Sequence, residues 1–228
     1  MQQYFIDRKV DIKDIVELDD DIIYHLKKVL RKDSSYSFRI VDSDRKVYLA
    51  HLSDRNRCVI DSLLDEDNEL SVDITCILSL IKADKFELCI QKLVELGVNR
   101  IVPYMSDRSV VRYVDDKKLK RWNKIALEAA EQSHRNIVPE VCGVIDQKQL
   151  DRYLSKYNFI CYEKADNIVD IDIDDSVSFI IGPEGGFDDK EYRNIVDVGF
   201  NPISLGKRIL RAETAAMYIT SVIVSKCQ

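Results

Sequence analysis

From residue 70 onward, the sequence alternates between short apolar runs typical of buried strands and amphipathic runs typical of helices. We predict strands over 72–80, 100–104, 159–162, 177–181 and 203–205, and helices over 85–96, 117–133, 188–198 and 214–226. Strands that alternate with helices form a mostly parallel sheet covered by helices on both faces. The sequence therefore predicts an α/β domain over residues 69–228.

The first 68 residues have a different pattern. Short alternating runs at 36–41 and 46–52 are separated by turn-forming residues, which is typical of antiparallel strands. One short helix is predicted around 21–30, and the acidic stretch 61–69 separates the two patterns. We therefore predict a small β domain over residues 1–68 in front of the α/β domain.

Several kinds of protein are disfavoured by the sequence. No apolar run approaches the ~18 residues of a membrane span, and the N-terminus lacks the apolar core of a signal peptide, so we expect a cytoplasmic protein without membrane contact. The 6 cysteines form no C-x-x-C pair, and no histidine completes a metal-ligand spacing. We expect reduced core cysteines and no metal.

The formal net charge of −6 is unevenly distributed. Segments 11–21, 61–73 and 166–175 carry −5, −6 and −5, whereas residues 100–135 hold nine Lys and Arg against five Asp and Glu. A basic face for RNA and a solvated helix face explain this distribution equally well.

A glycine-rich loop, 182–186, follows the predicted strand 177–181. Pro183 fixes its own φ, while Gly185 and Gly186 permit positive φ and the close approach of a ligand. We expect Asp188 to cap the next helix, with Glu191 completing a capping box. The loop matches neither a Walker motif nor G-x-G-x-x-G, and such a turn is structural more often than not.

A second loop, 205–211, places three cations just before the last helix. Cations at a helix N-terminus oppose the macrodipole, so either Arg211 pairs with Glu213 or an anionic ligand compensates. Because ligands bind outside the carboxyl ends of parallel strands, the two loops predict one shared ligand.

The last helix is apolar nearly all round, from Ala215 to Val224. One face must pack on its own sheet, so the other needs a second cover. We expect a partner subunit, and hence a homodimer, although a helix wedged centrally within one subunit is the alternative.

Four segments, 25–31, 131–139, 179–188 and 205–215, together resemble the RsmE family of 16S rRNA (uracil-N3)-methyltransferases in the SPOUT class. The resemblance covers essentially the whole chain. It implies an N-terminal PUA-like β-barrel, a C-terminal domain with a trefoil knot, a homodimer, and S-adenosyl-L-methionine as cofactor. The implied substrate is one uridine of 16S rRNA near the decoding centre of the small ribosomal subunit. His134, Lys207 and Ala212 depart from the family pattern.

The resemblance also implies roles for individual residues. Arg211 would stabilise the developing uracil anion, helped by Arg135, with Glu184 and Glu213 as weaker candidates for accepting the proton. The implied cofactor contacts are Ile181, Gly182, Pro183, Glu184, Gly186, Leu205, Gly206, Ile209, Leu210 and Thr214. The implied RNA contacts are Lys28, Arg31, Arg108, Arg135, Asn136 and Arg208.

Other interpretations stay open. An asparagine-capped loop would explain Arg135 and Asn136, and a solvated helix face would explain Lys28 and Arg31. Methylation of a ribose 2′-hydroxyl would keep the fold and the cofactor. A non-catalytic RNA-binding assembly factor would keep only the fold.

Overall fold

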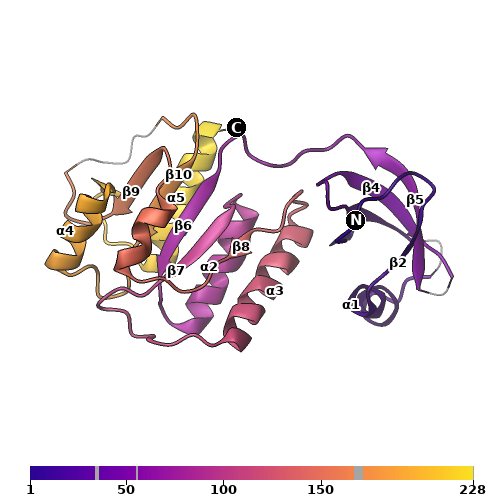
Figure 1. Ribbon diagram of the computed structural model, residues 1–228, viewed down its shortest axis with the longest axis horizontal. Coiled ribbons are helices and arrows are strands. Elements are labelled where there is room, and N and C mark those ends of the chain that lie inside the picture. The colour runs from indigo at the N-terminus through magenta and orange to yellow at the C-terminus, as the bar shows by residue number, and fades with distance from the viewer. Residues whose placement is uncertain (34–35, 55, 167–171, 228) are drawn as a thin grey trace. The chain divides into compact units, whose positions relative to one another are not determined.

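The computed structural model describes residues 1–33, 36–54, 56–166 and 172–227, and the chain divides into two units (Figure 1). The first unit comprises Met1–Glu69 and Ala130–Ile137, and the second comprises Leu70–Ala129 and Val138–Gln228. Within the described ranges, no helix is long and apolar enough to cross a membrane.

The first unit contains a five-stranded sheet in the order β1-β3-β4-β5-β2. β1 is parallel to β3 and the other pairs are antiparallel, so the sheet is mixed rather than purely antiparallel. The strands are β1 (Gln3–Phe5), β2 (Ile15–Glu17), β3 (Ser37–Val41), β4 (Val47–Leu52) and β5 (Arg57–Leu64). β5 runs into the acidic stretch predicted to separate the domains, because an irregularity between Leu49 and Ala50 lets β4 pair with it as far as Leu64.

One helical segment covers this sheet. It begins as α1 (Asp20–Tyr24) and continues as a π-helical turn, η1 (His25–Val29), over the range predicted as a single helix. Its Leu26 is fully buried in a core shared with Phe38 and Ile60. The core of the first unit is therefore formed between one sheet face and one short helix.

The segment 130–137 joins the first unit through Glu69. The carboxylate of Glu69 accepts hydrogen bonds from the backbone N–H of Asn136 at 2.8 Å and of Ile137 at 3.3 Å. Its other oxygen lies 2.5 Å from the guanidinium of Arg135, whose side chain is only 4% exposed. The amide of Asn136 also donates to the backbone oxygens of Arg45 and Glu66. Arg135 and Asn136 thus form a buried polar node with Glu69 in the first unit.

The second unit contains a six-stranded sheet in the order β11-β9-β10-β6-β7-β8. All its neighbouring strands are parallel. The strands are β6 (Ile74–Ser79), β7 (Arg100–Tyr104), β8 (Glu140–Val141), β9 (Tyr157–Cys161), β10 (Val177–Ile181) and β11 (Asn201–Ile203). The predicted α/β architecture with a parallel sheet is confirmed.

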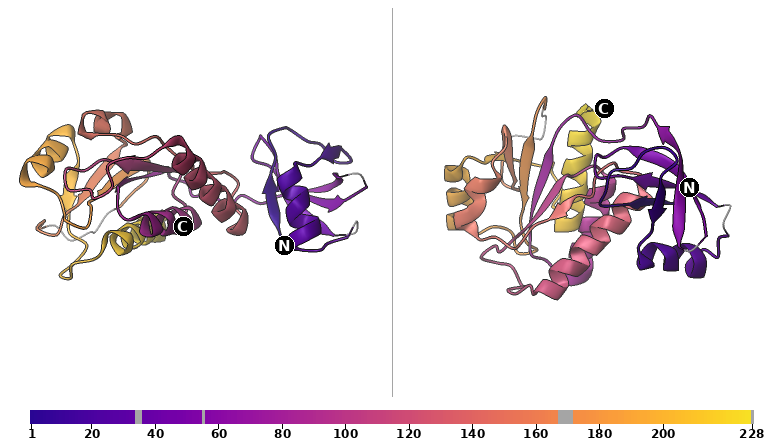
Figure 2. Two further views of the ribbon diagram at one scale, coloured as in Figure 1. Left: turned by 90° about the horizontal axis from the view of Figure 1, so that it is seen from below. Right: turned by 45° about the vertical axis from the view of Figure 1, so that its right-hand side comes forward.

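Helices cover both faces of this sheet (Figure 2). α2 (Ala83–Glu95) and α5 (Ala212–Cys227) pack together on one face, whereas α4 (Asp189–Val198) and the 3₁₀ helix η2 (Gln147–Tyr153) pack together on the other. α3 (Asp116–Gln132) packs against α2, because Trp122 stacks on Phe86 with 4.3 Å between the ring centroids.

The register of three strands places their carboxyl ends side by side. Ile181, the last residue of β10, pairs with Cys161, the last of β9, which in turn pairs with Ile203, the last of β11. The connection from β10 to β11 passes β9, since β11 lies on its far side. The loops that follow these three strands therefore start from one edge of the sheet.

The buried contacts of the node around Glu69 lead us to predict a change in the free energy of unfolding. Arg135→Met leaves the carboxylate of Glu69 without its guanidinium partner in a largely buried position, so we expect a loss of about 3–5 kcal/mol in the free energy of unfolding. Urea unfolding followed by far-ultraviolet circular dichroism measures this loss. Lys9→Met is the control, because the Lys9–Asp44 pair of the same unit is exposed. An Arg135→Met protein as stable as the control would contradict the structural role of the node.

Candidate active site

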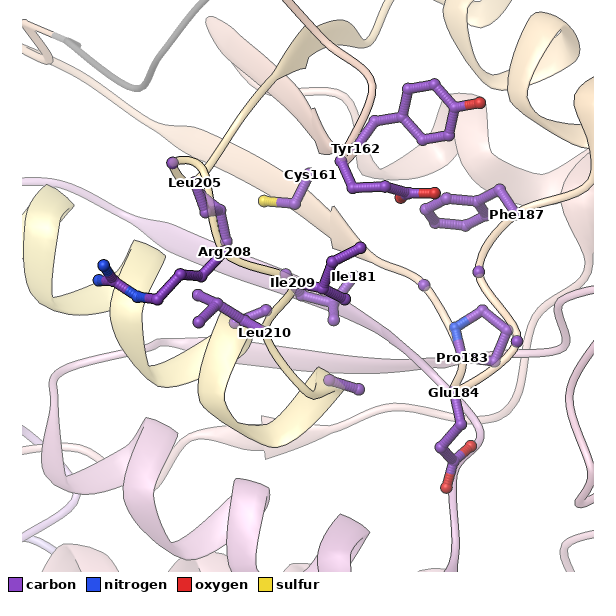
Figure 3. Close-up of a pocket in the computed structure, with 17 residues that line it drawn as sticks. Cys161, Tyr162, Ile181, Pro183, Glu184, Phe187, Leu205, Arg208, Ile209 and Leu210 are labelled. Carbon is purple, nitrogen blue, oxygen red and sulfur yellow. The ribbon is translucent and has the colours of Figure 1, made fainter.

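A cavity opens where the loops after β9, β10 and β11 meet (Figure 3). It encloses about 270 Å³, close to the lower end of the range of about 300–1,000 Å³ usual for small-molecule sites. Its position at the carboxyl ends of parallel strands is where open α/β sheets bind ligands. The residues that line it are Cys161, Tyr162, Glu163, Ile181, Gly182, Pro183, Glu184, Gly185, Gly186, Phe187, Leu205, Gly206, Arg208, Ile209, Leu210, Ala212 and Ala215.

The cavity brings together nine of the ten residues expected to hold a cofactor. The tenth, Thr214, is exposed on α5 and does not belong to the lining. The wall after β9, residues 161–163, was missed by the sequence analysis. Its strand was predicted, but the order β11-β9-β10 that places it between the two loops is not encoded in any local pattern.

The glycine loop is a closed turn. A side chain at Gly182 would begin 3.0 Å from the ring of Phe187, so only glycine lets that ring pack on the backbone. Gly186 has a φ of 66° and donates its N–H to the oxygen of Pro183 at 2.9 Å. The loop therefore presents backbone rather than side chains to much of the cavity.

The expected capping box after the glycine loop does not form. Asp188 does cap α4, accepting from the N–H of Lys190 at 2.8 Å, and this hydrogen bond lowers the pKa of the Asp188 carboxyl. Glu191, however, is 1% exposed and turns into the protein. Its carboxylate accepts hydrogen bonds from the hydroxyls of Tyr104 at 2.7 Å and Ser106 at 2.9 Å.

Glu191 thus holds the turn that follows β7. It also accepts from the N–H of Asp107 at 3.2 Å. Burial and the hydrogen bond to Glu191 raise the pKa of Tyr104, so its hydroxyl stays a donor at neutral pH. These three donors satisfy a carboxylate that would otherwise be costly to bury.

Arg108 connects this turn to the glycine loop. Its guanidinium donates to the oxygen of Gly185 at 3.1 Å and of Phe187 at 3.4 Å, and it lies 3.5 Å from the carboxylate of Asp188. The residue proposed from sequence as an RNA contact therefore supports a wall of the cavity, with about half of its side chain still exposed.

The cavity is apolar in its middle and charged at its ends. Ile181 and Leu210 form the middle, while Arg208 and Glu184 lie at opposite ends (Figure 3). Burial raises the pKa of the Cys161 thiol, so this wall residue stays protonated at neutral pH. Among the residues that the structure describes, no group of three or more His, Cys, Asp or Glu could hold a metal ion.

Much of the second loop is exposed. Gly206 has a φ of 110°, and a side chain at this position would begin in open space. Lys207, Arg208 and Ile209 are exposed, and Ile209 is 82% exposed although it lines the cavity. This loop therefore offers cationic and apolar groups at the mouth of the site.

The candidate catalytic residues occupy different places. Glu184 lines the cavity, and its carboxylate accepts from the N–H of Lys82 at the start of α2, at 3.4 Å. Arg211 is exposed just before α5, outside the lining. Glu213 pairs with Lys85 at 3.1 Å.

The surroundings of Glu213 hold its carboxyl in the charged form. Burial raises its pKa, but hydrogen bonds from its own backbone N–H and from Lys85 outweigh this, and the net pKa is lowered. The charge of Arg211 acts in the same direction. A general base works best with a pKa near the working pH, so Glu213 suits an ion-pairing role better.

Four predicted site residues lie in the first unit. Arg135 and Asn136 belong to the buried node around Glu69. Lys28 and Arg31 are exposed on η1 and just after it, and Arg31 has a φ of 53°.

Comparisons with known proteins agree on one family. The RNA methyltransferase domain family matches residues 68–224. Ribosomal RNA small subunit methyltransferase E of Mesomycoplasma hyopneumoniae is 35% identical over 100% of this chain and 99% of its own length. The Bacillus subtilis protein of the same name is 32% identical over 98% and 96%. A crystal structure of the Neisseria gonorrhoeae protein of that name, bound to S-adenosyl methionine, superposes with a TM-score of 0.91 over 99% of this chain and 97% of the other, at 32% identity.

The role of Glu191 can be tested without a ligand. Glu191→Gln replaces one acceptor oxygen with an NH₂ group that faces buried donors, so we expect a loss of about 1–3 kcal/mol in the free energy of unfolding. Fluorescence of Trp122 during urea unfolding reports on this unit. Asp189→Asn, exposed in the same helical turn, is the control and should change stability by no more than about 0.5 kcal/mol. Equal midpoints for the two variants would show that Glu191 does not hold the turn.

Proposed function

Since the chain belongs to the ribosomal RNA small subunit methyltransferase E family, we propose that it transfers a methyl group from S-adenosylmethionine to small-subunit ribosomal RNA. The observation that carries this proposal is the cavity at the carboxyl ends of β9, β10 and β11. A relative that matches 99% of this chain has been crystallised with S-adenosyl methionine.

The cavity fits the chemistry of this cofactor. Its apolar middle, with Ile181, Leu205 and Leu210, suits the adenine ring. The backbone of the glycine loop offers N–H and C=O groups to the ribose and the ring edge, as ligand sites on closed glycine turns do. Glu163 and Glu184 supply negative charge for the amino group and the sulfonium.

The remaining chemistry concerns one proton. When bound, S-adenosylmethionine supplies a methyl group on a positively charged sulfur, which is already an activated donor. The protein must position the acceptor nitrogen and stabilise it as its proton leaves. We assign the stabilising charge to Arg211, because it is an exposed cation at the entrance to α5, one residue from the cavity wall at Leu210. Glu184, one of two carboxylates in the lining, is the residue we assign to take the proton.

The acceptor we propose is N3 of one uridine in 16S rRNA, near the decoding centre. This choice rests on the resemblance of segments 25–31 and 131–139 to the uracil-N3 methyltransferases. A cytoplasmic location is part of the same proposal, because small ribosomal subunits are made there.

Two finer features of the fold belong to the same proposal. The crossover from β10 past β9 to β11, followed by the loop 205–211, supports a trefoil knot in which the end of the chain is threaded through. The curled mixed sheet of the first unit supports a PUA-like barrel that grips RNA. The exposed Lys28 and Arg31 would contact phosphates there.

A homodimer is supported by the outer face of α5. Tyr218 is 44% exposed there, and Met217 and Val222 are half-buried beside it. Such a face on a helix whose other side is in the core suits a second copy of the same helix.

Arg211 gives the sharpest prediction about catalysis. Arg211→Ala removes a preorganised positive charge, so we expect kcat on small ribosomal subunits to fall about 100- to 1,000-fold. The dissociation constant for S-adenosylmethionine should stay the same, since Arg211 does not line the cavity. Transfer of tritiated methyl groups measures kcat, with Arg152→Ala, exposed on η2, as the control. Near-normal turnover by Arg211→Ala would remove Arg211 from the mechanism.

The acceptor is identified by mass spectrometry of rRNA nucleosides from a strain that lacks this gene. We expect one 3-methyluridine to disappear from 16S rRNA and to return when subunits from that strain are incubated with the protein and cofactor. Loss of a 2′-O-methylated nucleoside instead would refute the uracil assignment, and no change at all would favour a non-catalytic role.

A further inference from the structure

Three apolar side chains of the second unit are strongly exposed, one on the cavity wall and two on the segment after β7. In the part of the second unit that the structure describes, the three most exposed large hydrophobic side chains are Ile209, Tyr113 and Val110, at 82%, 77% and 71%. Ile209 lines the cavity, and the other two lie on the segment between β7 and α3. Val110 and Tyr113 lie three residues apart on one segment, and neighbouring exposed apolar side chains of this kind indicate a binding surface.

The segment that carries Val110 and Tyr113 is tied to the cavity. Arg108 contacts the oxygen of Gly185, which lines the cavity. Tyr113 follows five residues later, so its Cα lies within about 17 Å of that of Arg108. The segment that carries Tyr113 is therefore anchored at the glycine-loop wall of the cavity through Arg108.

Hydrogen bonds to Glu191 and Arg112 also fix the start of this segment. Glu191 binds the hydroxyl of Ser106 and the N–H of Asp107. The guanidinium of Arg112 donates to the oxygen of Ser106 at 3.2 Å and to that of Asp107. The turn is thus fixed on two sides, which lowers the entropy cost of binding at Tyr113.

Charge indicates what kind of partner fits. Arg112 lies next to Tyr113, and Lys207 and Arg208 lie next to Ile209, all with exposed side chains. Lysine is depleted at protein interfaces, whereas sites for single-stranded nucleic acid combine lysine and arginine with aromatic side chains. The pairing of Tyr113 with Arg112 on one exposed segment, with further cations on the second loop, is typical of the second kind.

We propose that Tyr113 stacks on an unpaired base of the RNA next to the target nucleotide. Val110 extends the apolar surface of the same segment, and the exposed Arg112 contacts a flanking phosphate. This proposal rests on the proposed function and names a substrate-positioning residue that lies outside the cofactor cavity.

The test compares Tyr113→Ala with Tyr113→Phe, which keeps the ring. With small subunits from the deletion strain, we expect Tyr113→Ala to raise KM about 5- to 100-fold, as loss of one base stack does. Tyr113→Phe should stay within about twofold, because every base offers a face to a ring without a hydroxyl. Calorimetry should give the same dissociation constant for S-adenosylmethionine in all variants.

Leu154→Ala is the matched control. Leu154 is 41% exposed in the same unit but precedes β9, at the amino edge of the sheet. It should leave KM unchanged.

Two results would overturn the stacking proposal. The first is a Tyr113→Ala protein with the KM of the wild type. The second is a Tyr113→Ala protein whose sedimentation shows loss of an oligomer, which would mean that a second copy covers Tyr113.

Filter binding of a short single-stranded oligouridylate separates this proposal from the proposed function. If the wild type binds the oligonucleotide, Tyr113→Ala does not, and the wild type transfers no methyl group, then only the proposed function is contradicted.

Discussion

The register of the parallel strands β9, β10 and β11 is the constraint on which the site depends. It aligns Cys161, Ile181 and Ile203 at one edge of the sheet, so three loops that are distant in sequence must share one volume. Because β11 lies beyond β9, the chain has to cross that edge before it reaches α5. The cavity, its apolar middle and the cationic loop at its mouth all follow from this crossing.

Two carboxylates with little exposure, Glu69 and Glu191, play similar parts in the two units. Glu69 holds the segment 130–137 in the first unit, and Glu191 holds the turn after β7 in the second. Each accepts hydrogen bonds from residues far away in the sequence, and each is satisfied by several donors, as a buried charge must be. Through Arg108, the second carboxylate also supports the glycine loop, so the shape of the cavity depends on a group that does not line it.

The sequence predicts the bounds of individual strands and helices better than it predicts which strands pair and which side chains meet. β7 and β10 begin and end where their apolar runs do, because strands buried on both faces read as continuous apolar segments. The mixed pairing of β1 with β3 and the wall at residues 161–163 depend on long-range pairing, which no local pattern encodes. Glu191 had the spacing of a capping box, but its carboxylate accepts from Tyr104, Ser106 and Asp107 instead of the backbone N–H of Asp188. Arg135 lies in the first unit against Glu69, and its proposed help in catalysis stays a prediction.

The central claim is that the cavity formed by these three loops holds S-adenosylmethionine. Isothermal titration calorimetry of S-adenosylmethionine into the purified protein tests it most directly. We expect one site per chain, and we expect Gly182→Leu, which puts a branched side chain into the space of the Phe187 ring, to abolish the heat while the protein stays folded. Absence of heat with the wild type, or unchanged binding by the variant, would contradict it.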